Sequence, residues 1–165
     1  MQKEEHITKI GHWQIEVDRC ATEAAYLMIQ PWTGSCCIPC ANFQRLGQQV
    51  FPANVHELLR QLGIDYRKPA EVCHSFRTES GLHLYSGWFH VIGRILAGED
   101  SHLRCCEDGS TQRVVTVDIA AHCRLGLSES TDLVPSVMTS HPTVQIEFET
   151  DLPWVLDAPE PDQCP

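Results

Sequence analysis

Two cysteines separated by two residues, Cys37 and Cys40, form the strongest chemical motif of this sequence. Thiolates at CxxC spacing can bind one Zn²⁺ across a tight turn, although a closed tetrahedral site needs two further ligands. The chain has no second CxxC pair. The residues that could complete such a site are Cys36, Cys73, His74, His102, Cys105, Cys106, His122 and Cys123. We expect no obligatory cofactor, and zinc held by Cys37 and Cys40 is the metal that the motif allows.

The same CxxC pair also allows thiol–disulfide chemistry. Pro39 suits the first turn of a helix, so a thiol at its start would lie near the positive end of the dipole and lose its proton more easily. In thioredoxin-like proteins the motif joins a strand to a long helix, whereas here it follows a loop at 31–35. Zinc binding, thiol redox chemistry and simple packing therefore stay open as three interpretations.

The nine histidines of the chain do not form a recognised catalytic pattern. The sequence contains no HExxH, GxSxG, GxGxxG or phosphate-loop motif. His83 and His90 are expected on neighbouring strands, where packing within the sheet explains them. A general acid/base pair of His90 with Glu71 or Asp118 would depend on the fold to bring the groups together. We therefore predict no catalytic residue and favour a protein that is not an enzyme.

The acidic residues are unevenly distributed along the chain. The net charge is −10, and no Lys or Arg follows Arg124. The acidic residues beyond that point are Glu129, Asp132, Glu147, Glu149, Asp151, Asp157, Glu160 and Asp162. Such a negative field repels phosphate backbones and anionic lipid, and it attracts a basic protein. We expect no nucleic-acid or membrane partner and take Glu147, Glu149 and Asp151 as partner-binding candidates.

The length and composition fit one domain of 165 residues. We predict a single α+β domain at 1–157 and a loose tail at 158–165, where proline and acidic residues dominate. No apolar run reaches the roughly 18 residues of a membrane span, and the first residues lack the pattern of a signal peptide. The expected location is the cytoplasm.

Three segments have helical patterns. Asp18 can cap a helix that carries apolar residues from Ala21 to Met28, and a shorter helix is expected at 39–50. The clearest helix contains Val55, Leu58, Leu59 and Leu62 at helical spacing, with Asn54 and Glu57 as a capping box and Gly63 at the C-terminus.

Alternating patterns predict strands. The expected strands are 13–17, 70–76, 82–85, 88–96, 115–119 and 144–148, with a turn near Ser86 and Gly87, and 120–142 is expected to be a short helix or packed loop. Because helices come early and strands late, we predict an α+β fold. Its antiparallel sheet should have about five or six strands and pack against two or three helices.

Several motifs lie along the chain: CxxCxNF from residue 37, LGIDxxKPAEV from 62, GWFHxxG from 87, LVP from 133, QxEF from 145 and LPWVL from 152. With these motifs the chain resembles a family of small, functionally uncharacterised bacterial proteins. The resemblance covers residues 10–157 and implies a domain boundary but no activity. Small acidic bacterial proteins of this kind are often immunity proteins paired with toxins, which is an analogy of size and charge only.

The function expected from the sequence is that of a non-enzymatic acidic binding protein. Its most plausible role is an immunity protein that neutralises a basic toxin domain by occluding its active site, with Glu147, Glu149 and Asp151 steering the partner. This mechanism would lose its basis if these carboxylates were scattered or were paired with Arg113 or Arg124. The alternative is a zinc-binding or thiol-redox module centred on Cys37 and Cys40.

Overall fold

The computed structural model describes residues 5–34, 37–101, 103–105, 107, 111–113 and 116–161. The elements in chain order are β1 (Glu5–Ile10), β2 (Trp13–Asp18), α1 (Arg19–Met28), α2 (Ile38–Leu46), η1 (Gly47–Val50), α3 (Ala53–Gln61), β3 (Glu71–Arg77), β4 (His83–Ala97), β5 (Leu103–Cys105), β6 (Thr111–Arg113), β7 (Val117–Ala120), β8 (Cys123–Ser128), η2 (Ser136–Met138) and β9 (Thr143–Leu152). Seven strands form one sheet, and β5 and β6 form a separate hairpin. The α+β class with an antiparallel sheet is therefore confirmed, and the main sheet is one strand larger than expected.

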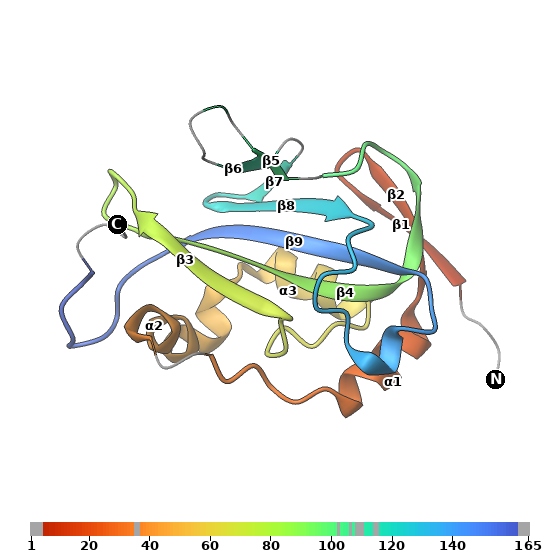
Figure 1. The fold of residues 1–165 in the computed structure, drawn as a ribbon, viewed down its shortest axis with the longest axis horizontal. Coiled ribbons are helices and arrows are strands. Elements are labelled where there is room, and N and C mark those ends of the chain that lie inside the picture. The colour runs from red at the N-terminus through yellow and green to blue at the C-terminus, as the bar shows by residue number, and fades with distance from the viewer. Residues whose placement is uncertain are drawn as a thin grey trace.

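The 15-residue strand β4 organises the main sheet (Figure 1). Along residues 83–92 it pairs with β9. Two strands share its other side, with β3 pairing along 83–88 and β2 along 93–97. The resulting order is β1-β2-β4-β9-β8-β7, with β3 also on β4, and all pairs are antiparallel.

Helix α1 contacts β4 within residues 89–92, which lie between the part of β4 that pairs with β3 and the part that pairs with β2. The hydroxyl of Tyr26 donates to the carbonyl of His90 at 3.0 Å and accepts from the His90 amide at 3.3 Å. The Ile92 amide donates to Oγ1 of Thr22 at 3.0 Å. Buried backbone groups need partners, so these two side chains fix α1 against the sheet at the residues of β4 that neither β3 nor β2 reaches.

The apolar core lies between the main sheet and the helices. Its centre is a group of phenylalanine rings, in which Phe148 of β9 lies 5.0 Å from Phe51, 5.6 Å from Phe89 and 6.2 Å from Phe43. Helix α3 lies behind β4 and β9 in Figure 1, while the segment 129–142 that joins β8 to β9 crosses in front of them. The two faces of the sheet are therefore covered differently.

The expected turn near Ser86 and Gly87 is wrong, because both residues lie inside β4. The turn between β3 and β4 is instead closed where the Thr78 amide donates to the Leu82 carbonyl at 2.7 Å. Gly87 has a steric role, since a Cβ there would overlap the carbonyl oxygen of Glu71 and the ring of Phe148. A glycine in a strand can mark a close approach of the backbone to its neighbours as well as a turn, and at Gly87 it marks a close approach.

Helix capping agrees with the sequence at one site and differs at another. Asp18 caps α1, accepting from the Ala21 amide at 2.9 Å as predicted. Helix α3 begins after Pro52 without a side-chain cap, so the capping box is wrong. Asn54 instead donates to the Ile119 carbonyl, and Glu57 accepts from Arg60.

The segment 120–142 contains the short helix η2, as expected, and in addition all of β8, which the sequence pattern did not indicate. In the described part of the expected tail, residues 158–161, Glu160 lies 2.8 Å from Nε of Arg77 and 3.3 Å from Nε2 of His83, and Trp154 donates to the Ala158 carbonyl at 2.8 Å. Residues 162–165 lie outside the described residues. Among the described residues, no helix is long and apolar enough to cross a membrane.

Candidate functional site

Strand β9 carries the three predicted partner-binding carboxylates on one side. The pairing of Leu84 with Asp151, Ser86 with Glu149 and Trp88 with Glu147 places all three on the face opposite the apolar core. We call this face, formed by the outward residues of β4, β9, β8 and β7, the polar face. The three carboxylates are thus aligned along one strand rather than scattered.

Glu147 nevertheless lies beneath the surface, with 5% of its area exposed. Its Oε1 accepts from Nε2 of Gln145 at 2.8 Å and from Oγ of Ser128 at 3.3 Å. Nearby, the indole of Trp88 donates to the Asp132 carbonyl at 3.1 Å and holds the 129–142 segment against the sheet. The sequence-based assignment of Glu147 as a contact residue is therefore not supported, because this carboxylate is enclosed by polar groups of the protein itself.

Glu149 and Asp151 lie further along the same face and line a hollow of about 300 Å³. The complete lining is Leu84, Asp118, His122, Cys123, Arg124, Glu149 and Asp151, which we call the acidic hollow. Arg124 Nη2 lies 2.8 Å from a Glu149 oxygen, and Nδ1 of His122 lies 3.4 Å from a carboxylate oxygen of Asp151. The pairing with Arg124 that would remove the basis of the steering mechanism thus occurs at Glu149, and the side chain of Arg113 lies outside the described residues.

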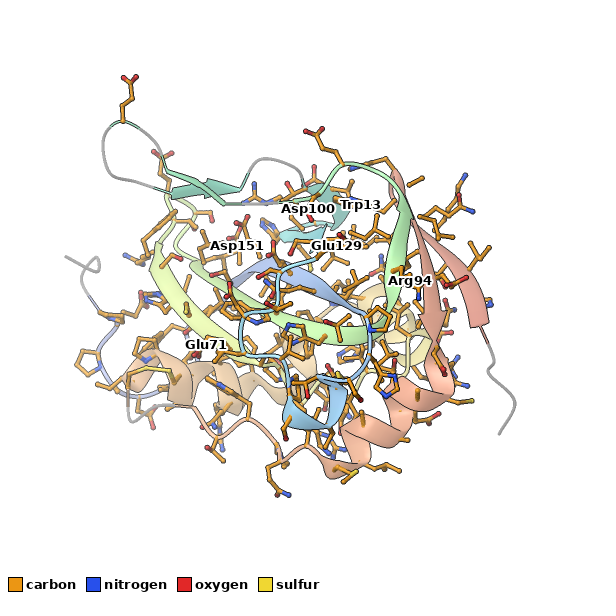
Figure 2. The ribbon with its side chains drawn as sticks, turned by 45° about the vertical axis from the view of Figure 1, so that its right-hand side comes forward. Trp13, Glu71, Arg94, Asp100, Glu129 and Asp151 are labelled. Carbon is orange, nitrogen blue, oxygen red and sulfur yellow. A yellow bond between two sulfur atoms is a disulfide. The ribbon has the colours of Figure 1, made fainter. Side chains whose placement is uncertain are left out.

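The acidic hollow keeps an excess of negative charge despite this pair. It contains three carboxylates and one guanidinium, and these four groups together carry a net charge of −2. Figure 2 shows Glu71, Asp100 and Glu129 on the same side of the molecule as Asp151. Sequence reasoning missed the hollow because its members come from four strands, β4, β7, β8 and β9, and from the turn at His122. The pairing of Asp118 with Arg124 and of Arg124 with Glu149 brings its charged residues together.

The structure keeps the ring of His90 apart from both His83 and Asp118. His83 and His90 belong to one strand and, seven residues apart, face opposite sides of it. His83 contacts Nε2 of His74 through its Nδ1 at 2.9 Å. His90 is 1% exposed on the polar face, and burial lowers its pKa to about 4. Asp118 lies on β7, separated from β4 by β8 and β9, so it forms no acid/base pair with His90.

Cys37 and Cys40 are joined by a disulfide, with their α-carbons 5.4 Å apart. Sulfur atoms bonded to each other are not available as zinc thiolates. The described residues contain no group of three or more His, Cys, Asp or Glu side chains that could hold a metal ion. Cys36, His102 and Cys106 lie outside the described residues, as does the side chain of Cys105. Cys123 is buried, which raises the pKa of its thiol to about 11.

Neither a protein-family model, nor a curated protein, nor a solved structure matches this chain.

Proposed function

We propose that the protein is a non-enzymatic binding protein that docks a basic protein partner on its polar face, in the manner of an immunity protein that covers a toxin's active site. The observation that supports this proposal is the acidic hollow, in which three carboxylates face one guanidinium. A Lys or Arg side chain of a partner entering it would meet Asp118 and Asp151, whose charges Arg124 offsets only in part. Complementary charge of this kind chiefly raises the rate of association and discriminates between partners.

The contact residues in this proposal differ from those expected from the sequence alone. Asp151 is retained, Asp118 is added, and Glu149 contributes together with its Arg124 partner. Glu147 takes a structural role, since exposing it would break its bonds with Gln145 and Ser128. The proposal therefore predicts that binding depends on the open end of the polar face and not on the end beneath the 129–142 segment.

The proposal can be tested by affinity purification from the source cells followed by native mass spectrometry of the complex. We expect a stoichiometric basic partner whose own activity is lost when bound. The double variant Asp118→Lys with Asp151→Lys should weaken binding by at least about tenfold, which corresponds to about 1.4 kcal/mol. Association with the wild-type protein should slow as salt concentration rises.

A matched control has the same kind of charge reversal on the opposite side of the sheet. Glu57 lies exposed on α3, so Glu57→Lys should leave the affinity unchanged. A partner that binds the double variant as tightly as the wild type would contradict the proposal, as would a bound partner whose activity persists in the complex.

A further inference from the structure

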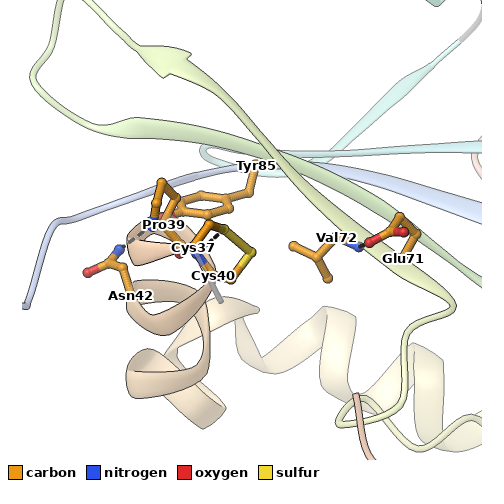
Figure 3. The surroundings of a disulfide bond; sticks show 7 residues. All are labelled: Cys37, Pro39, Cys40, Asn42, Glu71, Val72 and Tyr85. Carbon is orange, nitrogen blue, oxygen red and sulfur yellow. Dashed lines mark hydrogen bonds between the residues drawn. A yellow bond between two sulfur atoms is a disulfide. The ribbon is translucent and has the colours of Figure 1, made fainter. Parts of the chain in front are cut away.

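The segment Cys37–Cys40 begins the nine-residue helix α2, and Cys37 is its N-cap residue. The Sγ of Cys37 accepts from the Cys40 amide at 3.3 Å, so a sulfur occupies the place of the usual capping oxygen (Figure 3). Unpaired amide groups and the helix dipole favour negative charge at this position. A thiolate released at Cys37 would therefore be stabilised, as cysteines at helix N-termini generally are.

The two cysteines differ in their exposure. Cys37 is exposed, whereas Cys40 is 7% exposed and belongs to the apolar surroundings of α2. An external thiol can thus approach Cys37, while Cys40 is shielded. This asymmetry is what a dithiol pair needs to have one attacking and one resolving cysteine.

The first turn of α2 is anchored by contacts that do not involve the disulfide. The Tyr85 hydroxyl donates to the Pro39 carbonyl at 2.9 Å and accepts from Nδ2 of Asn42 at 3.2 Å. Asn42, which is fully buried, also accepts from the Val155 amide at 2.8 Å. The helix start should therefore remain in place when the sulfur–sulfur bond is broken.

The disulfide also contributes little as a structural restraint. It spans a sequence separation of three residues. In the chain-entropy description, a disulfide stabilises a fold more as the loop that it closes becomes longer, so a loop this short gives the smallest benefit. Its position at an anchored helix N-terminus fits exchange chemistry better than stabilisation.

We propose that Cys37 and Cys40 form a redox-active dithiol–disulfide pair that exchanges electrons with a dithiol substrate. A substrate thiolate attacks Sγ of Cys37, the sulfur–sulfur bond breaks, and its electron pair goes to Sγ of Cys40, which takes a proton. The second substrate thiolate then attacks the substrate sulfur of the mixed disulfide and releases the Cys37 thiolate. Two electrons pass from the substrate to the protein, and the substrate leaves as a disulfide; a disulfide substrate reacts in the reverse direction.

The test is to equilibrate the full-length protein in glutathione redox buffers without oxygen, then block free thiols and map them by mass spectrometry. We expect Cys37 and Cys40 to convert together between the linked and reduced forms while circular dichroism stays that of the folded protein. A pair that remains oxidised in excess reduced glutathione until the chain unfolds would overturn the proposal, as would a different pairing of Cys37.

Variants separate the roles of the two sulfurs. Cys40→Ser should accumulate a mixed disulfide with glutathione at Cys37, because no resolving thiol remains, and Cys37→Ser should accumulate none at Cys40. The matched control is Cys73, an exposed thiol on β3 whose pKa is raised by partial burial and by Glu71. Cys73→Ser combined with Cys40→Ser should leave the adduct at Cys37, and an adduct found at Cys36 instead would contradict the assignment.

The role of Cys37 can also be tested on the reduced wild-type protein, so that the test does not depend on the folding of a variant. At neutral pH, iodoacetamide should alkylate Cys37 at least about tenfold faster than Cys73, since the thiolate is the reacting form. Equal rates at the two residues would overturn the assignment of Cys37 as the attacking thiol.

Discussion

The side chains on the two sides of strand β9 share one backbone but need different surroundings. Toward the helices, Ile146 and Phe148 meet other apolar side chains, and burial is favourable without any particular partner. On the polar face, Gln145 and Glu147 are also buried, but each of their polar atoms needs a suitably placed group. Equal burial therefore has different consequences on the two sides of β9, because one side depends on contact area and the other on individual hydrogen bonds.

The polar face itself divides into a covered end and an open end. The segment 129–142 covers Gln145, Glu147 and His90, while Glu149 and Asp151 line the acidic hollow. All five residues lie on the same face, so strand alternation cannot distinguish them. What distinguishes them is the path of the connecting segment.

The largest expected effect comes from removing apolar contact on the helix side. Phe148 is 1% exposed and touches three other phenylalanine rings, so Phe148→Ala should lower the free energy of unfolding by about 3–5 kcal/mol. The neighbouring change Glu149→Ala, which removes a partly exposed ion pair, should cost less than about 1 kcal/mol. Urea denaturation of both variants measures the difference, and similar losses would refute the contrast between the faces.

The next effect concerns pH and the covered end of the polar face. His90 has a folded pKa of about 4 against an ordinary value of 6.5, because burial disfavours the imidazolium. Between pH 6.5 and pH 4, His90 therefore binds more protons in the unfolded chain than in the folded protein. Because of this difference, the free energy of unfolding decreases as the pH falls from 6.5 to 4. At about 1.4 kcal/mol per pKa unit, the loss approaches about 3 kcal/mol.

The pH effect is measured by comparing urea denaturation of the wild type and His90→Leu at several pH values across that window. The free energy of unfolding of the variant should depend less steeply on pH, because His90 no longer contributes to that dependence. An identical pH dependence in the two proteins would show that other groups are responsible.

A smaller effect is expected for the contact that fastens the covering segment. Trp88→Phe removes the indole donor to the Asp132 carbonyl and should cost about 1 kcal/mol. Amide hydrogen exchange should become faster in 129–142 but not in α3, which lies on the other side of the sheet. Uniformly faster exchange would indicate that Trp88 supports the whole fold and not this segment.

The smallest effect on stability is expected at the open end. Arg124 and Glu149 are joined at 2.8 Å with side chains 48% and 20% exposed, so Arg124→Gln should cost less than about 1 kcal/mol. That cost should shrink at high salt, as expected for a screened pair. A larger, salt-independent loss in thermal unfolding would show that the pair is part of the structural framework.

Much of the fold could be predicted from local patterns. The alternation at Trp13, Ile15 and Val17 predicts β2, and the Asp18 cap predicts where α1 begins. These signals work because alternation and capping are properties of adjacent residues. Strand β1 was not predicted, since it pairs with β2 at the edge of the described sheet and its place there depends on that pairing.

The candidate site was predictable only in part. The sequence identified Cys37 and Cys40 as a chemical pair, and a tight spacing keeps two side chains close in any fold. The acidic hollow was not predictable in the same way, because Asp118 and Asp151 come together only through two intervening strand pairings.

The fold class, the side of β9 on which each residue lies and the CxxC pair could be predicted from the sequence, because each depends on short spacing along the chain. The enclosure of Glu147, the pairing of Glu149 with Arg124 and the greater exposure of Cys37 depend on the tertiary structure. The exposure of a residue and the partner of its charge depend on which distant segments of the chain lie beside it. The residues next to it in the sequence do not determine which segments these are.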